Sequence, residues 1–209
     1  MHNYLTDFFL IAGLHFLALI SPGPDFVMIT RNSLVYSRKT GVMSALGLAC
    51  GIAVHISYCL IGIAYIISKS IVIFSTLKLL GAGYLIFIGY KSIKVKPSQA
   101  SEIIEDRKDM GKFAALKMGF LTNLFNPKAT LFFLALFTQV IYPQTPIYIK
   151  LCYGLEMSAM TFVWFAFVAL VLSHNQIKRR FTSIQHYVER VTGAALIGLG
   201  LKVALSKAR

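Results

Sequence analysis

Three charged residues, Asp25, Lys128 and Glu156, stand inside stretches of this sequence that are otherwise apolar. A charge at the centre of a bilayer costs about 2.5–3.5 kcal/mol on insertion scales, so charges kept in such stretches commonly belong to ion or substrate pathways. An acid placed there can meet a substrate ammonium group or carry a proton, and a lysine can meet a carboxylate. Structural alternatives stay open, with Asp25 as a helix cap and Lys128 reaching the membrane interface.

Two proline motifs, SPGPD and NPK, interrupt two of these apolar stretches. A proline inside a helix costs about 3 kcal/mol or more, and in lipid the freed backbone carbonyls find no water. Both motifs also have the pattern of a helix start, because Ser21 and Asn126 are favoured caps ahead of Pro22 and Pro127. The sequence therefore predicts two helices that restart near the middle of the membrane.

The start of a helix has free N–H groups and a partial positive charge. If the two restarted helices enter from opposite sides of the membrane, their starts converge and form a binding site for a carboxylate, as in transporters with broken helices. The alternative is that each proline only kinks a continuous helix.

The composition indicates an integral membrane protein. The chain has 209 residues, of which 56% are hydrophobic, and its mean hydropathy is +0.68, which exceeds that of soluble domains. The N-terminal MHNYLTD has no Lys or Arg and no cleavage pattern follows it, so we expect the first segment to remain in the protein. Six segments are long enough to span a bilayer: 8–30, 43–67, 71–90, 113–141, 147–173 and 188–206.

The basic residues set the predicted orientation. Most of the 21 Lys and Arg residues fall in the loops that follow segments one, three and five. They are Arg31, Arg38, Lys39, Lys91, Lys94, Lys96, Arg107, Lys108, Lys112, Lys117, Lys178, Arg179, Arg180 and Arg190. The positive-inside rule places these loops in the cytoplasm and both termini in the periplasm, with residues 91–112 as a cytoplasmic linker. Because topology accounts for most of the charge, nucleic acid is not expected as a partner.

The chain also contains a weak internal repeat. GAGYLIFIGYK at 81–91 is similar to GAALIGLGLK at 193–202, and the first segment of each half carries a proline break. We therefore expect a single all-α transmembrane domain over 1–209, built from six helices as a 3+3 inverted repeat with helices one and four broken. The halves are residues 1–95 and 113–209. A chance similarity of Gly-Ala-rich helices is the alternative.

Other motifs favour packing over chemistry. Gly47 and Gly51 form a small-xxx-small pattern that predicts close helix packing, and His55 is predicted to be a packed, hydrogen-bonded side chain. The five histidines are scattered without HExxH or a comparable cluster, so no metal site is expected. We find no nucleophile with a base, so an enzyme is not expected, nor is a cofactor.

Four stretches, HFLALISPGPDF (15–26), GLACGIAV (47–54), residues 81–91 and GFLTNLFNPKA (119–129), resemble the LysE/RhtB family of amino-acid exporters. The resemblance covers nearly the whole chain, and the pairing of SPGP with TNxxNPK is specific. Cys50-Gly51, Pro24-Asp25-Phe26 and the segment from Glu156 to Trp164-Phe165 are most similar to the threonine-efflux branch. The resemblance implies inner-membrane export of amino acids or their derivatives, driven by the proton-motive force. Five-span and six-span topologies are both compatible with the family, and the basic loops here favour six.

These observations predict a secondary transporter of the inner membrane that exports small neutral, threonine- or homoserine-like amino acids or derivatives. Its partners would be the amino acid, protons and the lipid bilayer. Glu156 and Asp25 are the candidates to carry the coupling proton. The predicted substrate-binding residues are Ser21, Pro22, Gly23, Pro24, Asp25, Asn123, Asn126, Pro127, Lys128 and Glu156.

Other functions stay open on the sequence alone. They are export of another amino acid or of a cation, a membrane-embedded enzyme, and an assembly subunit that transports nothing. The sequence does not specify the amino acid, the proton stoichiometry or which acid carries the proton, and a homodimer is one open oligomeric state.

Overall fold

The chain forms a bundle of helices in a computed structural model that describes residues 3–21, 23–69, 71–94, 109–140, 145–171 and 175–205. Within these ranges every regular element is an α-helix. The helices are α1 (Tyr4–Ile20), α2 (Pro24–Val35), α3 (Arg38–Lys69), α4 (Ile71–Ile93), α5 (Lys112–Leu124), α6 (Pro127–Val140), α7 (Ile147–Val171) and α8 (Asn175–Leu205). The expectation of an all-α protein is confirmed for the described residues.

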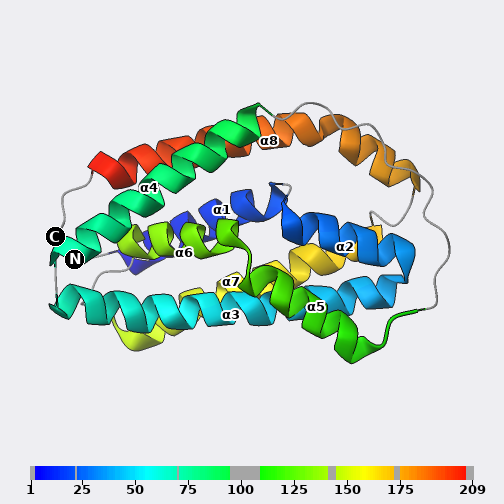
Figure 1. The fold of residues 1–209 in the computed structure, drawn as a ribbon, viewed down its shortest axis with the longest axis horizontal. Helices are drawn as coiled ribbons and strands as arrows, with labels where there is room; N and C mark the ends of the chain where they lie inside the picture. The colour runs from blue at the N-terminus through cyan, green and yellow to red at the C-terminus, as the bar shows by residue number, and fades with distance from the viewer. Residues whose placement is uncertain are drawn as a thin grey trace.

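Two broken helices run through the middle of the bundle in opposite directions (Figure 1). Helices α1 and α2 follow one another from left to right, and α5 and α6 follow one another from right to left. The pair α4 and α8 lies along one side of them, and α3 and α7 lie along the other, with α3 packed extensively against α5 and α7. The beginning of α1 and the end of α8 lie at the same end of the molecule.

Length and composition identify two to four candidate membrane spans among the described residues. Residues Arg38–Gly62 of α3 and the whole of α7 qualify alone. The pairs α1–α2 and α5–α6 qualify when each is taken as one span, and they are bent by 56° and 57° at their breaks. The predicted segment 71–90 lies within α4, and residues 188–205 of the predicted segment 188–206 lie within α8. The chain is thus a helical membrane protein whose predicted breaks are real.

Two sequence expectations about helix starts need correction. Ser21 does not cap the second helix: it is the C-cap of α1, and its N–H donates to Leu17 O. Gly23 is the N-cap of α2 and Pro24 is its first residue, so the second Pro of the motif, not Pro22, begins the helix. Pro22 itself lies outside the described residues. The last helix begins at Asn175 and so extends ahead of the predicted membrane segment 188–206.

Glycines let two pairs of helices approach closely. A Cβ at Gly47 or at Gly119 would overlap the backbone of the facing helix, because α3 and α5 touch there. This contact confirms the expected packing role of Gly47 within the bundle. Helices α4 and α8 meet in the same way, with Gly89 against Ile197 and Gly200 against Ile86. Small residues at such crossings let the helix backbones approach closely and make van der Waals contacts. These contacts matter in lipid because no hydrophobic effect drives the helices together there.

Two apolar clusters lie on either side of the breaks. One contains Ile11, Ile52 and Phe133, and the other contains Leu19, Leu48 and Phe165. Large apolar side chains elsewhere point outward: Phe9, Val27, Ile61, Phe125, Leu155 and Val163 are all more than 60% exposed. An outer surface of this kind suits contact with lipid. The breaks therefore place polar backbone between two apolar layers.

Candidate functional site

The two helix breaks lie together at the centre of the bundle and are joined by a hydrogen bond. The side-chain amide of Asn123, at the end of α5, donates to Asp25 Oδ2 over 2.8 Å. Asp25 occupies the first turn of α2, as the sequence predicted. The other carboxylate oxygen of Asp25 is buried and has no hydrogen-bond partner among the described residues, so it remains available to a ligand.

The start of α6 is capped as the sequence predicted. Asn126 Oδ1 accepts a hydrogen bond of 3.0 Å from the N–H of Lys128, and the Thr130 hydroxyl donates to Asn126 O over 3.2 Å. Pro127 is the first residue of α6. The starts of α2 and α6 thus meet at the middle of the bundle and point away from each other (Figure 1), which concentrates two partial positive charges there.

Lys128 stabilises the broken end of α1. Its ammonium group donates to Ser21 O over 3.1 Å and to Ala18 O over 3.3 Å. A cation is unfavourable at the start of its own helix, but it is favourable at the C-terminus of another. The lysine therefore satisfies carbonyls that the break leaves without helical partners. Its charge also attracts Asp25 across the site.

His55 supports the corresponding end of α5. Its Nε2 lies 3.0 Å from Asn123 O, and its ring stacks on Phe133 with centroids 5.7 Å apart. Its Nδ1 contacts the Tyr58 hydroxyl. These contacts agree with the predicted packed and hydrogen-bonded role. On the same face of α3, a Cβ at Gly51 would lie only 2.7 Å from Asn123 Oδ1, so the glycine gives the asparagine its space.

A cavity opens between the two breaks. Its volume is about 40 Å³, against the about 10–15 Å³ that holds one water, so it has room for about three waters. Most of the predicted binding residues line it: Ser21, Gly23, Asp25, Asn123, Asn126 and Lys128. Pro24 and Pro127 do not line it but begin the two helices whose first turns do.

Glu156 lies apart from this cavity. It is on α7 and does not line the cavity. Both of its carboxylate oxygens are buried without a hydrogen-bond partner in the described part of the chain. The structure therefore separates the two predicted acids, with Asp25 at the breaks and Glu156 on a neighbouring helix.

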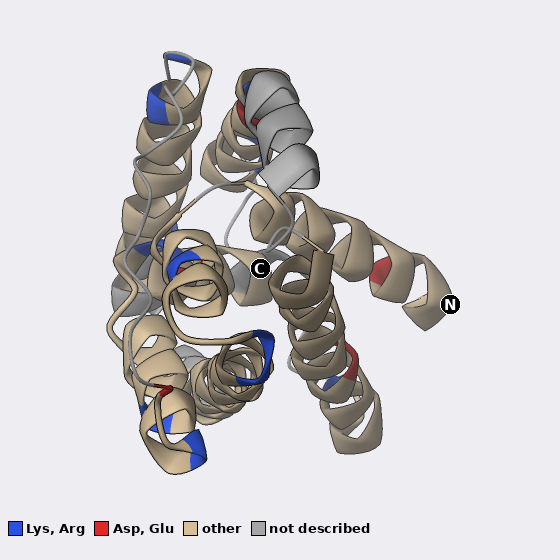
Figure 2. Cartoon of the chain, turned by 90° about the vertical axis from the view of Figure 1, so that its right-hand side faces the viewer, with Lys and Arg blue, Asp and Glu red and all other residues tan. Residues whose placement is uncertain are grey.

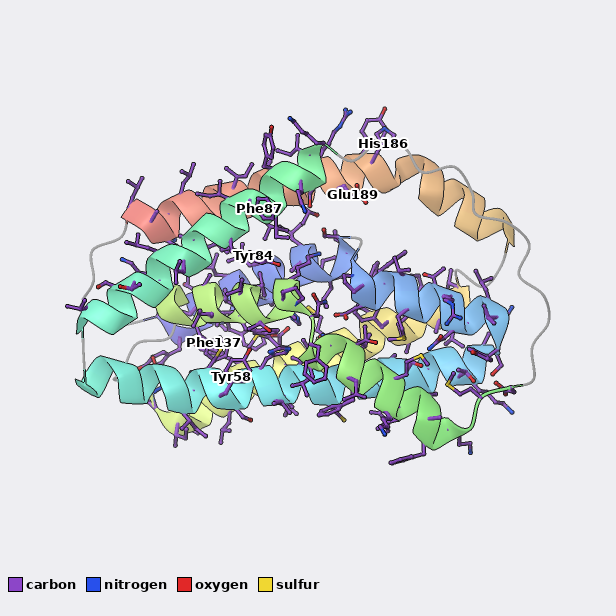
Figure 3. All side chains as sticks on the ribbon, viewed as in Figure 1. Tyr58, Tyr84, Phe87, Phe137, His186 and Glu189 are labelled. Atoms are coloured by element: carbon purple, nitrogen blue, oxygen red, sulfur yellow. The ribbon has the colours of Figure 1, made fainter. Side chains whose placement is uncertain are left out.

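Sequence reasoning missed several residues of the site. His15, Phe132, Phe133 and Phe165 line the cavity, and His15 had no signal beyond its place in the HFLALISPGPDF motif. Glu189 was also missed. It is 4% exposed and its charge attracts Lys128, and Figure 3 shows it on the side of α8 that faces α1 and α2. A glutamate inside the predicted span 188–206 was the signal that could have identified it.

The described residues hold no group of three His, Cys, Asp or Glu side chains that could bind a metal ion. Basic residues lie at the ends of several helices. Figure 2 shows them from the end of the bundle at which α3 and α5 begin. The site combines two helix starts, one cation, one carboxylate and two amides. Helix starts and the lysine can bind a carboxylate, and Asp25 can bind an ammonium group, so the arrangement fits a small zwitterion.

Comparisons with known proteins agree with this chemistry. The family model described as LysE type translocator matches residues 16–207. An uncharacterized membrane protein, YrhP of Bacillus subtilis, is 30% identical over 90% of this chain and 93% of its own length. The threonine efflux proteins of Salmonella typhi and Escherichia coli K12 are 28% and 27% identical, each over 97% of this chain and 100% of their own. No solved structure matches the chain.

Proposed function

This chain belongs to the LysE type translocator family, and from that premise we propose that it exports small neutral amino acids or their derivatives. We propose threonine- or homoserine-like substrates, because the threonine efflux proteins match it over almost its full length. In this proposal the chain lies in the inner membrane, its termini are periplasmic, and the proton-motive force drives export.

The observation that supports the proposal best is the meeting of the starts of α2 and α6 at one cavity. The substrate carboxylate binds at these helix starts, beside Lys128, and chiefly at the start of α2, which has no side-chain cap. The substrate ammonium group binds the Asp25 oxygen that has no protein partner. Asn123 holds Asp25 in place from the other half of the chain. Each charge of the zwitterion thus meets an opposite charge in a site shielded from water.

A second part of the proposal concerns the proton. Asp25 and Glu156 are its candidate carriers, and they differ in position: one contacts the site directly and the other lies outside the cavity. A carboxyl group without a protein partner, as in Glu156, is best suited to alternate between charged and neutral forms. Glu156→Gln should retain binding and lose dependence on the pH gradient, whereas Asp25→Asn should weaken binding.

We also propose six spans arranged as two inverted halves. The contacts between α4 and α8 support this arrangement, because Gly89 meets Ile197 while Gly200 meets Ile86. Under the sequence alignment of 81–91 with 193–202, these two contacts are equivalent, as a two-fold axis between the helices requires. A cysteine introduced at Gln99, in the predicted cytoplasmic linker, should resist labelling from outside intact cells.

Replacing Pro127 tests the functional proposal. Pro127→Leu permits a continuous helix, which removes the separate helix start of α6 and its partial positive charge. Purified variant protein in liposomes should therefore lose counterflow of labelled threonine while still inserting into the membrane. Pro146→Leu, just ahead of α7 and outside the cavity, is the matched control and should retain transport. Unchanged transport by Pro127→Leu would show that this break is a packing kink.

A further inference from the structure

His15 lies at the apolar end of the cavity. It is 1% exposed and lines the cavity together with Phe132, Phe133 and Phe165. The other polar residues of the lining, Ser21, Asp25, Asn123, Asn126 and Lys128, all belong to the two breaks. His15 is therefore the polar group that a substrate side chain meets when the charged ends of the substrate bind at the breaks.

The imidazole ring has a fixed position. It contacts Phe133 with centroids 5.6 Å apart and stacks on Phe132 at 6.2 Å. On its other edge, Nε2 lies 3.4 Å from the Thr161 hydroxyl oxygen of α7. Two aromatic neighbours and one polar neighbour thus hold the ring from three different positions.

The hydrogen bonds of Thr161 define which ring nitrogen carries the proton. The Thr161 hydroxyl donates its single hydrogen to Met157 O over 2.9 Å, so towards His15 it can only accept. Nε2 must then be the N–H donor, and Nδ1 of the neutral imidazole is an acceptor.

This acceptor has no protein partner. Nδ1 of His15 is buried and makes no hydrogen bond with any described residue. A buried acceptor without a donor is unfavourable, so a ligand that brings a hydrogen-bond donor to Nδ1 gains affinity. A ligand that brings a methyl group to the same position leaves the acceptor unsatisfied.

We propose that His15 is a specificity-determining residue: its Nδ1 accepts a hydrogen bond from a hydroxyl group on the substrate side chain. It thereby selects hydroxylated amino acids over aliphatic ones of the same shape. This inference rests on the proposed export of small amino acids and adds the residue that distinguishes among them.

Threonine and valine provide the test, because they differ only by a hydroxyl in place of a methyl group. Counterflow of each labelled amino acid is measured in liposomes that contain the purified protein, and kcat/KM is compared. The wild type should favour threonine by about tenfold or more. His15→Phe keeps a ring of similar shape but has no acceptor, and its preference should fall to within about twofold. His15→Gln retains an acceptor and should keep a clear preference for threonine.

Three outcomes separate the hypotheses. Equal kcat/KM values for threonine and valine in the wild type would overturn the role of His15 and leave amino-acid export standing. A wild-type preference in His15→Phe would do the same. Folded wild-type protein that transports no amino acid would overturn the proposed function and this inference with it. If His15→Phe does not fold, Thr161→Val decides: it removes the acceptor that fixes the ring, and the threonine preference should fall.

Discussion

The side-chain amide of Asn123 donates a hydrogen bond of 2.8 Å to the carboxylate of Asp25, from which it is separated by 98 positions in the sequence. One residue ends the first part of a broken helix, and the other lies in the first turn of the restarted part of a second broken helix. The hydrogen bond therefore joins the two breaks directly. It also leaves one oxygen of Asp25 without a protein partner, at the edge of the cavity.

Replacing Asp25 by asparagine removes the charge of this side chain but keeps its hydrogen bond with Asn123. The amide oxygen of Asp25→Asn can still accept the hydrogen bond from Asn123, so the protein should fold and reach the membrane. The attraction to a substrate ammonium group is lost, and threonine binding should weaken by about tenfold or more, the range of one charge-assisted hydrogen bond. Radioligand binding to purified protein measures this effect. Asp7→Asn, in α1 and away from the cavity, is the control, and equal loss in both variants would contradict a specific role of Asp25.

Lys128 should affect both stability and transport. Lys128→Met removes two hydrogen bonds to the end of α1 and leaves Ala18 O and Ser21 O without that donor. We expect a loss of at least about 2–3 kcal/mol in the free energy of unfolding, since each hydrogen bond to a charged group is worth about 1.5–3 kcal/mol, together with loss of transport. Thermal unfolding in detergent and liposome counterflow report the two effects. Lys117→Met, on an exposed part of α5, should change neither.

The contact between α3 and α5 predicts a sharp difference between glycines. A Cβ at Gly119 would overlap the Ser44 carbonyl of α3, so Gly119→Ala should force the helices apart and cost about 1–3 kcal/mol of stability. At Gly83 a Cβ meets nothing within 4 Å, so Gly83→Ala should be neutral or slightly stabilising. Thermal unfolding of the two variants side by side tests the packing, and similar midpoints would show that α3 and α5 do not touch as described.

Asp109, which lies outside the candidate membrane spans, makes a contact that gives a pH dependence. Asp109, just ahead of α5, accepts hydrogen bonds from Thr40 (2.7 Å) and Ser37 (3.0 Å) at the turn between α2 and α3. These bonds, that from Thr40 foremost, lower the pKa of Asp109 below its usual value of 3.8. A lowered pKa means that the contact stabilises the fold above about pH 4 and is lost as the pH falls below that value.

Asp109→Asn provides the measurement. The wild type should unfold at a higher temperature than the variant at pH 7, and the difference should shrink as the pH falls below about 4. A difference that stays constant down to pH 3 would show that ionisation of Asp109 does not contribute. Thr40→Val removes one of the donors to Asp109. In a protein that carries Thr40→Val, the difference in unfolding temperature caused by Asp109→Asn at pH 7 should therefore be smaller.

Local sequence rules located the breaks but not every boundary. Both Ser21-Pro22 and Gly23-Pro24 satisfy the rule of a cap followed by proline, and only the tertiary fold selects the second pair. At the second break Asn126-Pro127 is the single pair of a cap residue and a proline, and in the structure Asn126 does cap the helix. Where two local solutions are equivalent, packing decides between them.

Residues that act through distant partners were beyond the sequence. Lys128 was recognised as out of place at the start of a helix, but the carbonyls that explain it are 107 and 110 positions away. The sequence alone does not distinguish His15 from the other histidines. The ring of His15 is held by Thr161, which lies 146 positions later in the chain. Such relationships depend on which helices meet, which one sequence does not specify.

The central claim, that this site carries a small amino acid out of the cell in exchange for protons, is tested most directly in inverted membrane vesicles. In these vesicles the periplasmic face is inside, so export appears as uptake of labelled threonine. With an acidic interior, the wild type should accumulate threonine, and collapse of the gradient by an uncoupler should abolish accumulation. Asp25→Asn vesicles should accumulate far less threonine than the wild type with the gradient present. Accumulation by the wild type that is the same with and without the gradient, or absent in both, would contradict the account.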